Sequence, residues 1–397
     1  MSTAWLKPGR EKSLFRGHPW IFSSALEKVE LSRGVNPIGE TIDVLTRQGE
    51  FLARGAYSPV SQIRIRVWTK DEAESISEEF FRKRIEACRH LRENIIQLSD
   101  TDAIRLVHGE SDGLPGLIVD RYAHTIVIQC LNAGIEKWRD VIVRCLIDQV
   151  ECDRVYERSD TDVRKLEGLE ERAGLLHGSE PPVSIEIQEA GIRYLVDIRR
   201  GQKTGFYLDQ RANRSIIKEL ARDRSVLDCF AYSGSFTVAA LCGGALRVTA
   251  IDSSAAALDL ARKNLTLNSL PDDSAELKVG DVFRELRELR DRGEKYDLII
   301  LDPPKFAPTI TQAQQASRAY KDINLLSLKL LNPGGFLVTF SCSGGINEAL
   351  FEKIIAGAAV DARVEAKIIA RLHQAADHPV ALNFPEGAYL KGFVIAT

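Results

Sequence analysis

Acidic residues stand at the ends of four predicted strands in the second half of this 397-residue chain. Asp228 lies in the first of these strands, and Asp252, Asp281 and Asp302 end or follow the next three. In an open α/β sheet, ligands bind outside the carboxyl ends of the strands, so we expect these carboxylates to share one edge. Asp252 is suited to accept both hydroxyl groups of a ribose, and Asp281 to bind an adenine amino group. The series therefore indicates a site for a ligand with a ribose and an adenine ring.

The turn after the first of these strands contains one glycine, Gly234, with serine neighbours. A dinucleotide site would need the pattern GxGxxG, because a pyrophosphate requires close backbone approach at several positions. The turn thus argues against NAD and favours a compact ligand without phosphates. An acidic residue at a strand end is also a common helix cap, and Ser253 and Ser254 compete with Asp252 for that position. The predicted cofactor contacts are Phe230, Tyr232, Ser233, Gly234, Asp252, Asp281 and Asp302.

Seven cysteines are scattered along the chain, and no pair has CxxC spacing. An odd number without a framework argues against disulfides and against a zinc site. His373 and His378 show no metal-ligand spacing either, so we expect structural roles for both and no metal. Only Cys342 stands at the carboxyl end of a later strand, in the segment Phe340-Ser-Cys-Ser343. A thiolate there can act as a nucleophile that forms a covalent intermediate; a core thiol is the alternative.

Three regions with different patterns must position these residues. Residues 1–70 contain alternating apolar and polar runs separated by glycine-bearing turns, which predicts a small antiparallel β domain. Residues 75–182 predict an α+β domain with helices over 77–99 and 134–149, ending at the polar stretch 177–182. Residues 183–397 begin with a hairpin and continue as a doubly wound α/β sheet. The strands predicted there are 226–229, 248–252, 277–280, 298–302, 336–341, 366–372 and 389–395.

The first seventy residues carry eleven Lys and Arg against six Asp and Glu, although the whole chain has a net charge of −3. A basic module on an acidic body is compatible with a polyanion partner or with a solvated basic face. No apolar stretch approaches the roughly 18 residues of a membrane span, and none resembles a secretion signal. We therefore expect a cytoplasmic location and no membrane partner. The candidate phosphate-binding residues are Lys7, Arg10, Lys12, Arg64 and Arg66.

The strand-end motifs resemble those of class I S-adenosylmethionine-dependent methyltransferases, and the whole chain resembles the bacterial large-subunit methyltransferase I family of 23S rRNA (cytosine-5) methyltransferases. The resemblance is carried by segments such as Gly109-Glu-Ser-Asp-Gly-Leu-Pro-Gly116, Asp228-Cys-Phe-Ala-Tyr-Ser-Gly-Ser-Phe236, Asp302-Pro-Pro-Lys305 and Gln374-Ala-Ala-Asp-His-Pro379. It implies an N-terminal PUA-like RNA-binding domain over 1–70, a central α+β domain over 75–182 and a Rossmann-like methyltransferase domain over 183–397. It also implies S-adenosylmethionine as methyl donor and 23S rRNA, naked or in a partly assembled large subunit, as acceptor. A homodimer is left open.

C5 of cytosine is a poor nucleophile, and addition of a thiolate at C6 makes it able to take a methyl group. The resemblance raises Cys342 from a candidate to the expected nucleophile, since Phe340-Ser-Cys-Ser343 matches the nucleophile motif of the family. Asp302 is the candidate for protonating or hydrogen-bonding N3 of the base. Lys305 binds the base or a phosphate, or is a solvated loop residue. Many RNA cytosine-5 methyltransferases have a Pro-Cys where this chain has Asp302-Pro-Pro-Lys305, so the group that assists thiol release is unassigned.

Other interpretations stay open. An acidic-Pro-Pro motif is also used by enzymes that methylate exocyclic amines, and a degenerate fold could serve as a non-catalytic ribosome-assembly factor. The segment Lys203–Arg211 fits a loop that covers the cofactor or a flipped base, with Phe206 or Tyr207 stacking on a ring. It fits equally the capped start of a helix with Asp209 in the first turn.

Overall fold

The computed structural model describes residues 2–307 and 312–397, which form two compact units. Unit 1 comprises residues 1–187, 196–208 and 376–387, and unit 2 comprises 188–195, 209–375 and 388–397. Within the described residues no helix is both long and apolar enough to cross a membrane.

Unit 1 begins with a six-stranded sheet in the order β2-β6-β5-β4-β1-β3. All of its neighbouring strands are antiparallel except β1 and β4. Alternating side chains such as Ile42 and Val44 are buried on one face, which is the period-two pattern that predicted these strands. The bounds are β1 Ser2–Leu6, α1 Lys12–Phe15, β2 Trp20–Phe22, β3 Leu26–Glu30, β4 Thr41–Leu45, β5 Phe51–Tyr57 and β6 Ile63–Thr69. The β-rich N-terminal domain is confirmed.

A five-stranded sheet in the order β11-β10-β9-β8-β7 follows, with two long helices. The helices begin where short polar side chains cap them: Ser77 accepts from the Phe80 amide, and Asn132 from the Ile135 amide. The bounds are α2 Glu78–Ile95, β7 Ala103–His108, β8 Leu117–Tyr122, β9 Thr125–Cys130, α3 Ala133–Gln149, β10 Arg154–Ser159, α4 Val163–Leu166 and β11 Arg172–Gly178. The prediction missed β11, which is an edge strand with mostly exposed side chains and overlaps the polar stretch taken as a boundary.

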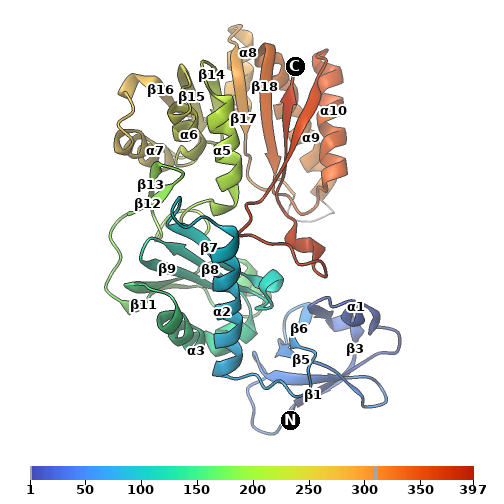
Figure 1. Cartoon of the computed structure of the whole chain (residues 1–397). Coiled ribbons are helices and arrows are strands. Elements are labelled where there is room, and N and C mark those ends of the chain that lie inside the picture. The colour runs from blue at the N-terminus through green and yellow to red at the C-terminus, as the bar shows by residue number, and fades with distance from the viewer. Residues whose placement is uncertain (1, 308–311) are drawn as a thin grey trace. The chain divides into compact units, whose positions relative to one another are not determined.

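The seven-stranded sheet of unit 2 has the order β16-β15-β14-β17-β18-β20-β19, and only β20 runs antiparallel to its neighbours. Figure 1 labels strands β14 to β18 of this sheet. Helices α8, α9 and α10 share one apolar core with this sheet. The strands are β14 Ser225–Cys229, β15 Arg247–Asp252, β16 Ala275–Val279, β17 Tyr296–Leu301, β18 Leu331–Ser341, β19 Lys367–His373 and β20 Lys391–Ala396. The helices are α5 Arg211–Leu220, α6 Ser235–Cys242, α7 Ala255–Leu267, α8 Val282–Asp291, α9 Ala313–Leu330 and α10 Glu348–Ala362, and the hairpin β12 Ile185–Glu189 and β13 Ile192–Val196 precedes them.

The strand order reverses between β14 and β17, and this places the ends of those two strands at the switch point of the sheet. Every side chain of β14 is buried, as expected for a parallel strand covered on both faces. Strand β18 starts five residues earlier than predicted, because Leu331 pairs with Tyr296 ahead of a bulge at Asn332-Pro-Gly-Gly335, a sequence that resembles a turn. The doubly wound α/β sheet is confirmed.

Candidate functional site

The turn after β14 is held in an unusual backbone conformation. Phe230, Tyr232 and Gly234 have φ values of 64°, 47° and 73°, in the left-handed region that favours glycine. A Cβ at Gly234 would lie 2.8 Å from Cβ of Ala261, so glycine is needed for space as well as for conformation. Non-glycine residues with positive φ persist where surrounding contacts impose them, and such residues gather at ligand sites.

Asp252 is one of the groups that impose this turn. Its Oδ2 accepts a hydrogen bond from the Tyr232 amide at 2.8 Å, and its Oδ1 accepts one from the Ser254 amide at 2.8 Å. The side chain that caps α7 belongs to Ser254, whose Oγ accepts from Ala257 at 3.2 Å. Asp252 is therefore not the helix cap, and its half-buried carboxylate keeps lone pairs for a ligand.

Asp281, by contrast, does cap a helix: its Oδ1 accepts from the Arg284 amide at 2.9 Å at the start of α8. The neighbouring Gly280 amide donates to the carbonyl of Asp252 at 2.9 Å, which ties the ends of β15 and β16 together. Asp281 is exposed, so its remaining lone pairs face solvent.

Three phenylalanines gather at the same edge, and only Phe230 was predicted. Phe230 lies with its ring centroid 6.5 Å from that of Phe283 and 6.4 Å from that of Phe306, and the latter two are 5.8 Å apart. Phe283 and Phe306 each follow a strand-end aspartate by two to four residues, which is a signal the sequence did offer. The cluster provides apolar ring surface beside the acidic residues.

Asp228 lies in β14, just before this turn, and is completely buried. Thr237 Oγ1 donates to its Oδ2 at 2.6 Å, while Oδ1 accepts no hydrogen bond within the part of the chain that the structure describes. Burial raises the pKa of this carboxyl to about 7; the hydrogen bond from Thr237 opposes the shift and the nearby Asp302 adds to it.

This burial predicts a pH dependence of stability. Because folding raises the pKa of Asp228, its protonated form stabilises the fold below the ordinary pKa, and that contribution is lost as the pH rises through about 7. We expect the wild-type protein to lose about 3 kcal/mol of unfolding free energy relative to Asp228→Asn between pH 5 and pH 8. Denaturant titrations of both proteins across this range measure the difference, and a difference that does not change with pH would refute the assignment.

The β17 end brings Asp302 into the site. Gln210 Nε2 donates to Asp302 Oδ2 at 3.0 Å, and Asn213 Nδ2 holds Gln210 Oε1 at 2.5 Å. Sequence reasoning missed this Gln210–Asn213 pair, which comes from the start of α5. Lys305, three residues after Asp302, is exposed to solvent.

Cys342 directly follows the last residue of β18 and is half-buried, with Sγ 3.9 Å from the carbonyl oxygen of Pro303. The serines on both sides of Cys342, Ser341 and Ser343, form hydrogen bonds that fix the position of this segment. Ser341 Oγ donates to the Tyr320 hydroxyl at 3.0 Å, and the Tyr320 hydroxyl is 2.9 Å from Ser343 Oγ. Ser343 Oγ also accepts from the amides of Phe306 and Ala307, both at 3.1 Å. These contacts join the cysteine to the loop that carries Asp302.

The other six cysteines are poor candidates for a nucleophile. Burial raises the pKa of each of their thiols, for Cys88 to about 12, and so disfavours the thiolate. None of the six stands at the carboxyl end of β17 or β18.

The proposed phosphate-binding residues divide into two groups. Lys7, Arg10 and Lys12 are exposed, as expected, with Lys7 Nζ donating to the Ser24 carbonyl at 2.9 Å. Arg64 is half-buried and donates to the carbonyls of Ser58 and Pro59.

The prediction is wrong for Arg66. This side chain is 8% exposed, and its Nη1 lies 2.7 Å from Oε1 of Glu167, which is itself buried. The alternating sequence of β6 could not indicate that Glu167, about a hundred residues further along the chain, forms an ion pair with Arg66.

The segment before α5 also departs from expectation. Phe206 is buried at 2% exposure and is not available to stack on a base. Tyr207 is half-buried, and Lys203 Nζ lies 4.3 Å from the centre of its ring. Asp209 lies in a 3-10 turn before α5 and accepts from the Tyr389 hydroxyl at 2.5 Å, so it does not cap the helix.

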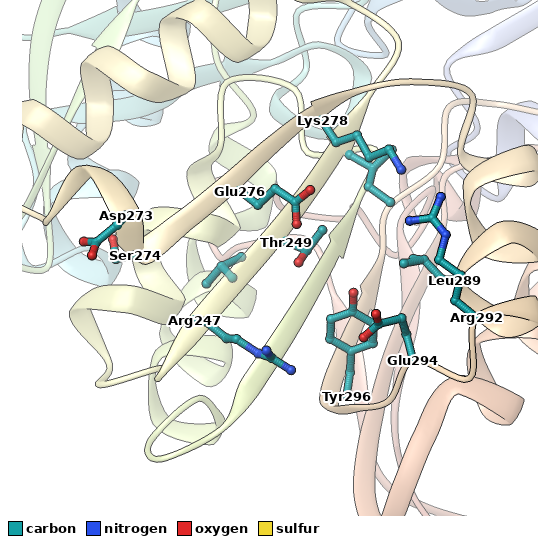
Figure 2. Close-up of a pocket in the computed structure, with 12 residues that line it drawn as sticks. Arg247, Thr249, Asp273, Ser274, Glu276, Lys278, Leu289, Arg292, Glu294 and Tyr296 are labelled. Atoms are coloured by element: carbon teal, nitrogen blue, oxygen red, sulfur yellow. The ribbon is translucent and has the colours of Figure 1, made fainter.

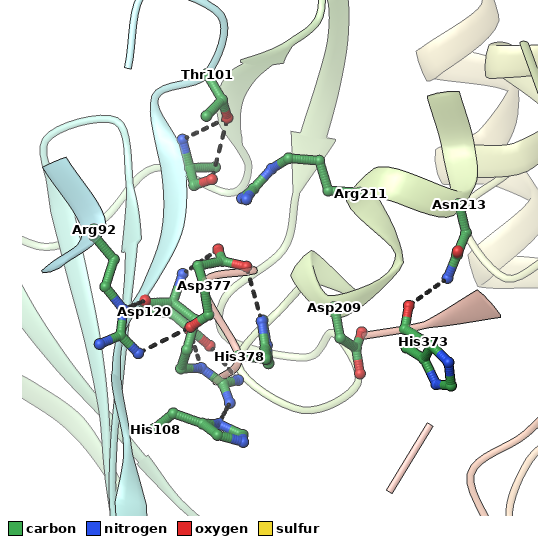
Figure 3. A network of polar contacts seen from close by, with 12 residues as sticks. Arg92, Thr101, His108, Asp120, Asp209, Arg211, Asn213, His373, Asp377 and His378 are labelled. Carbon is green, nitrogen blue, oxygen red and sulfur yellow. Dashed lines mark hydrogen bonds and ion pairs between the residues drawn. The ribbon is translucent and has the colours of Figure 1, made fainter. Parts of the chain in front are cut away.

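His378 is part of a buried polar network in unit 1 (Figure 3). Its Nδ1 is 3.0 Å from Asp377 Oδ1, and Asp377 accepts from the amide of Arg105 and, through its carbonyl, from Arg92. This fits the structural role expected for His378. In unit 2, the carbonyl of His373 accepts from Asn213 at 3.1 Å.

A separate pocket of about 260 Å³ lies near the amino-terminal ends of β15 and β17 (Figure 2). Its lining mixes basic and acidic side chains, such as Arg247, Lys278, Glu276 and Glu294, around Tyr296. Arg247 and Tyr296 are the first residues of their strands. Ligands of this fold bind at the opposite ends of the strands, so we place the functional site at the Asp252–Cys342 edge.

Comparisons with known proteins show which family this chain resembles. A family model for S-adenosylmethionine-dependent methyltransferases matches residues 169–380, and one for PUA-like domains matches residues 5–70. A Ribosomal RNA large subunit methyltransferase I from Shewanella denitrificans is 49% identical over 389 residues, which are 98% of this chain and 98% of that protein. The protein of the same name from Shigella boydii serotype 4 is 50% identical over 98% of this chain and 97% of its own.

Solved structures share the fold over the full chain. A candidate S-adenosylmethionine-dependent methyltransferase from Streptococcus mutans has a TM-score of 0.85 at 24% identity, with all of both chains covered. A second structure, of a candidate methyltransferase complexed with SAH, has a TM-score of 0.86 at the same identity and coverage.

Proposed function

Because this chain belongs to the ribosomal RNA large subunit methyltransferase I family, we propose that it methylates C5 of a cytosine in 23S rRNA, using S-adenosylmethionine as donor and Cys342 as a covalent nucleophile. The observation that carries the proposal is the fastening of Cys342, through Ser341, Tyr320 and Ser343, to the loop that bears Asp302. The substrate is naked rRNA or a partly assembled large subunit.

The residues at the strand ends fit the donor. Asp252 offers carboxylate lone pairs for the ribose, Asp281 an exposed carboxylate for the adenine amino group, and Phe230 and Phe283 apolar ring surface. The single glycine of this turn, Gly234, fits a ligand without phosphates, because a pyrophosphate requires close backbone approach at several positions. When bound, S-adenosylmethionine supplies a methyl group on a positively charged sulfur.

The proposed chemistry begins when the Cys342 thiolate bonds to C6 of the cytosine and the electron pair of the C5–C6 bond becomes available at C5. Asp302 in its protonated form donates a hydrogen bond or its proton to N3 and so stabilises the negative charge that develops in the ring; Gln210 Nε2 donates to Asp302 Oδ2 and holds the carboxyl group in place. C5 then bonds to the methyl carbon, and the electron pair of the broken sulfur–methyl bond stays on the sulfur of the donor. A base, for which water suffices, removes the C5 proton. The C5–H electron pair re-forms the C5–C6 double bond, and the C6–S pair leaves with the Cys342 sulfur, which releases the product. Lys305, exposed beside this loop, binds the base or a phosphate.

The alternative acceptor is an exocyclic amine, since that chemistry also uses an acidic-Pro-Pro loop. Methylation of an exocyclic amine needs no thiol, so it does not explain why Cys342 lies next to the loop that carries Asp302. Bisulfite sequencing of rRNA methylated in vitro separates the two, because 5-methylcytosine resists conversion. A target cytosine that carries the methyl group before bisulfite treatment and is then read as converted would refute the C5 assignment.

RNA capture is assigned to three exposed cations of the N-terminal domain that lie between β1 and the start of α1, Lys7, Arg10 and Lys12. We expect the double change Arg10→Glu and Lys12→Glu to weaken RNA binding and to reduce the salt dependence of log K by roughly one unit per lost phosphate contact. Arg33→Glu, an exposed residue of the same domain outside this group, is the matched control. Equal salt slopes in the double variant and the wild type would assign RNA capture to another surface.

A further inference from the structure

Lys391 is a buried cation next to the candidate nucleophile. It is the first residue of β20 and is 6% exposed, although lysine side chains are almost never buried without a partner. Its Nζ donates one hydrogen bond, to the carbonyl of Ser343 at 2.9 Å. Within the described ranges 2–307 and 312–397, no carboxylate forms an ion pair with it.

The strand register brings Lys391 to the end of β18, at the segment that contains Cys342. Lys391 pairs with Ser341 on β18 on one side and with His373 on β19 on the other. From a position opposite Ser341, its side chain reaches the carbonyl of Ser343. The ammonium is therefore held at the carbonyl of the residue that directly follows Cys342.

Among the charged and titratable groups around Lys391, no carboxylate pairs with its ammonium within the described residues. Burial lowers the pKa of Lys391 and the exposed Lys305 lowers it further, whereas Cys342 and Glu348 raise it. Glu348 instead forms an ion pair with Arg371 at 2.6 Å. Burial raises the pKa of Tyr320 to about 12, so this neighbour is a neutral phenol at physiological pH. Cys342 is thus the titratable neighbour whose ionised form favours a charged Lys391.

We propose that Lys391 is a positioning residue that holds Cys342 in its thiolate form, an inference that rests on the proposed covalent mechanism. The thiol proton passes to water, the electron pair stays on sulfur, and the fixed ammonium compensates the charge. The same cation favours departure of the sulfur from C6 at the end of the reaction, because the electron pair then returns to sulfur. Lys391 thereby assists thiol release in a chain that lacks the second cysteine of many RNA cytosine-5 methyltransferases.

The test follows the ionisation of Cys342 in the full-length protein without RNA. The rate of iodoacetamide labelling at Cys342, read by peptide mass spectrometry from pH 5 to pH 10, gives the midpoint of thiolate formation. We expect Lys391→Met to raise this midpoint by about one to two pH units, and so to slow labelling at low pH by about ten-fold or more. Lys391→Arg keeps the charge and should stay near the wild type. Lys329→Met, an exposed lysine at the end of α9, is the control.

A purely structural Lys391 would give a different result. Loss of the Ser343 contact alone would lower turnover at every pH, whereas loss of thiolate stabilisation lowers kcat most at low pH and is rescued toward pH 9. An unchanged labelling midpoint in Lys391→Met would overturn the proposal. If that variant fails to bind S-adenosylmethionine and is therefore misfolded, the reciprocal measurement decides. Cys342→Ala should lower the pKa of Lys391, read from pH-dependent reductive methylation of that lysine, and no change would refute the pairing.

Failure of this inference is distinguishable from failure of the proposed function. Labelling of Cys342 needs neither RNA nor methyl transfer, so it reports only on the thiol and its neighbour. If Cys342→Ser still methylated C5, the covalent mechanism would be excluded, whatever pH midpoint of thiolate formation the labelling of Cys342 gave.

Discussion

Replacement of Cys342 by serine is expected to reduce methyl transfer to 23S rRNA by at least about 10³-fold while leaving the affinity for S-adenosylmethionine within a few-fold. A serine hydroxyl is not ionised at neutral pH and cannot add to C6 of a pyrimidine at a useful rate. The cofactor affinity should survive because Cys342 and its flanking serines contact the 303–307 loop, Tyr320 and Lys391, which belong to other segments than the turn after β14.

The measurement is incorporation of labelled methyl groups into a 23S rRNA transcript, together with calorimetric titration of the cofactor. Cys242→Ser is the matched control, since Cys242 is also half-buried in unit 2 but ends α6, and it should retain activity. Turnover close to that of the wild type in Cys342→Ser would exclude the covalent mechanism.

Replacement of Asp252 by alanine is expected to weaken cofactor binding by about 100-fold or more. The change removes both carboxylate oxygens. These oxygens are the proposed acceptors for the ribose hydroxyls, and they also accept hydrogen bonds from the amides of Tyr232 and Ser254 at 2.8 Å. The left-handed conformation at Tyr232 would lose a contact that imposes it, so the turn itself should relax. Asp252→Asn keeps one carbonyl acceptor and should have a smaller effect.

Asp281→Ala provides the comparison for this prediction. Asp281 caps α8 from an exposed position, so its loss should cost about 1 kcal/mol of stability and less affinity than the loss of Asp252. Calorimetric titration of Asp252→Ala, Asp252→Asn and Asp281→Ala with the cofactor measures the order of their affinities. Affinity within three-fold of the wild type in Asp252→Ala would contradict the assignment of the ribose site.

The edge of the unit 2 sheet was predictable because its strands are short, apolar and parallel. Strand β14 is buried along its whole length, so the polar residues that follow it stand out in the sequence. The switch point then follows from the rule that ligands bind at the carboxyl ends of such strands, and Asp228, Asp252, Asp302 and Cys342 could all be placed there.

What the sequence did not reveal depends on contacts between distant segments. Lys391 and Tyr320 reach the Cys342 site from β20 and α9, and no local spacing connects them to it. Arg66 shows the opposite error: its alternation on β6 was predicted correctly, but Glu167 neutralises it from a hundred residues away. Phe206 likewise has the aromatic character of a stacking residue but is enclosed by the fold. Burial and pairing of charges are tertiary properties, and sequence periodicity does not contain them.

The most direct test of the account is trapping of the enzyme on RNA that contains 5-fluorocytidine at the target position. The thiolate adds to C6 and the methyl group reaches C5, but fluorine cannot leave as a cation, so release of the sulfur is blocked. We predict a stable protein–RNA conjugate that forms only with S-adenosylmethionine and maps by mass spectrometry to Cys342. Absence of a conjugate from enzyme that is active on normal RNA, or attachment at another residue, would contradict the covalent role of Cys342.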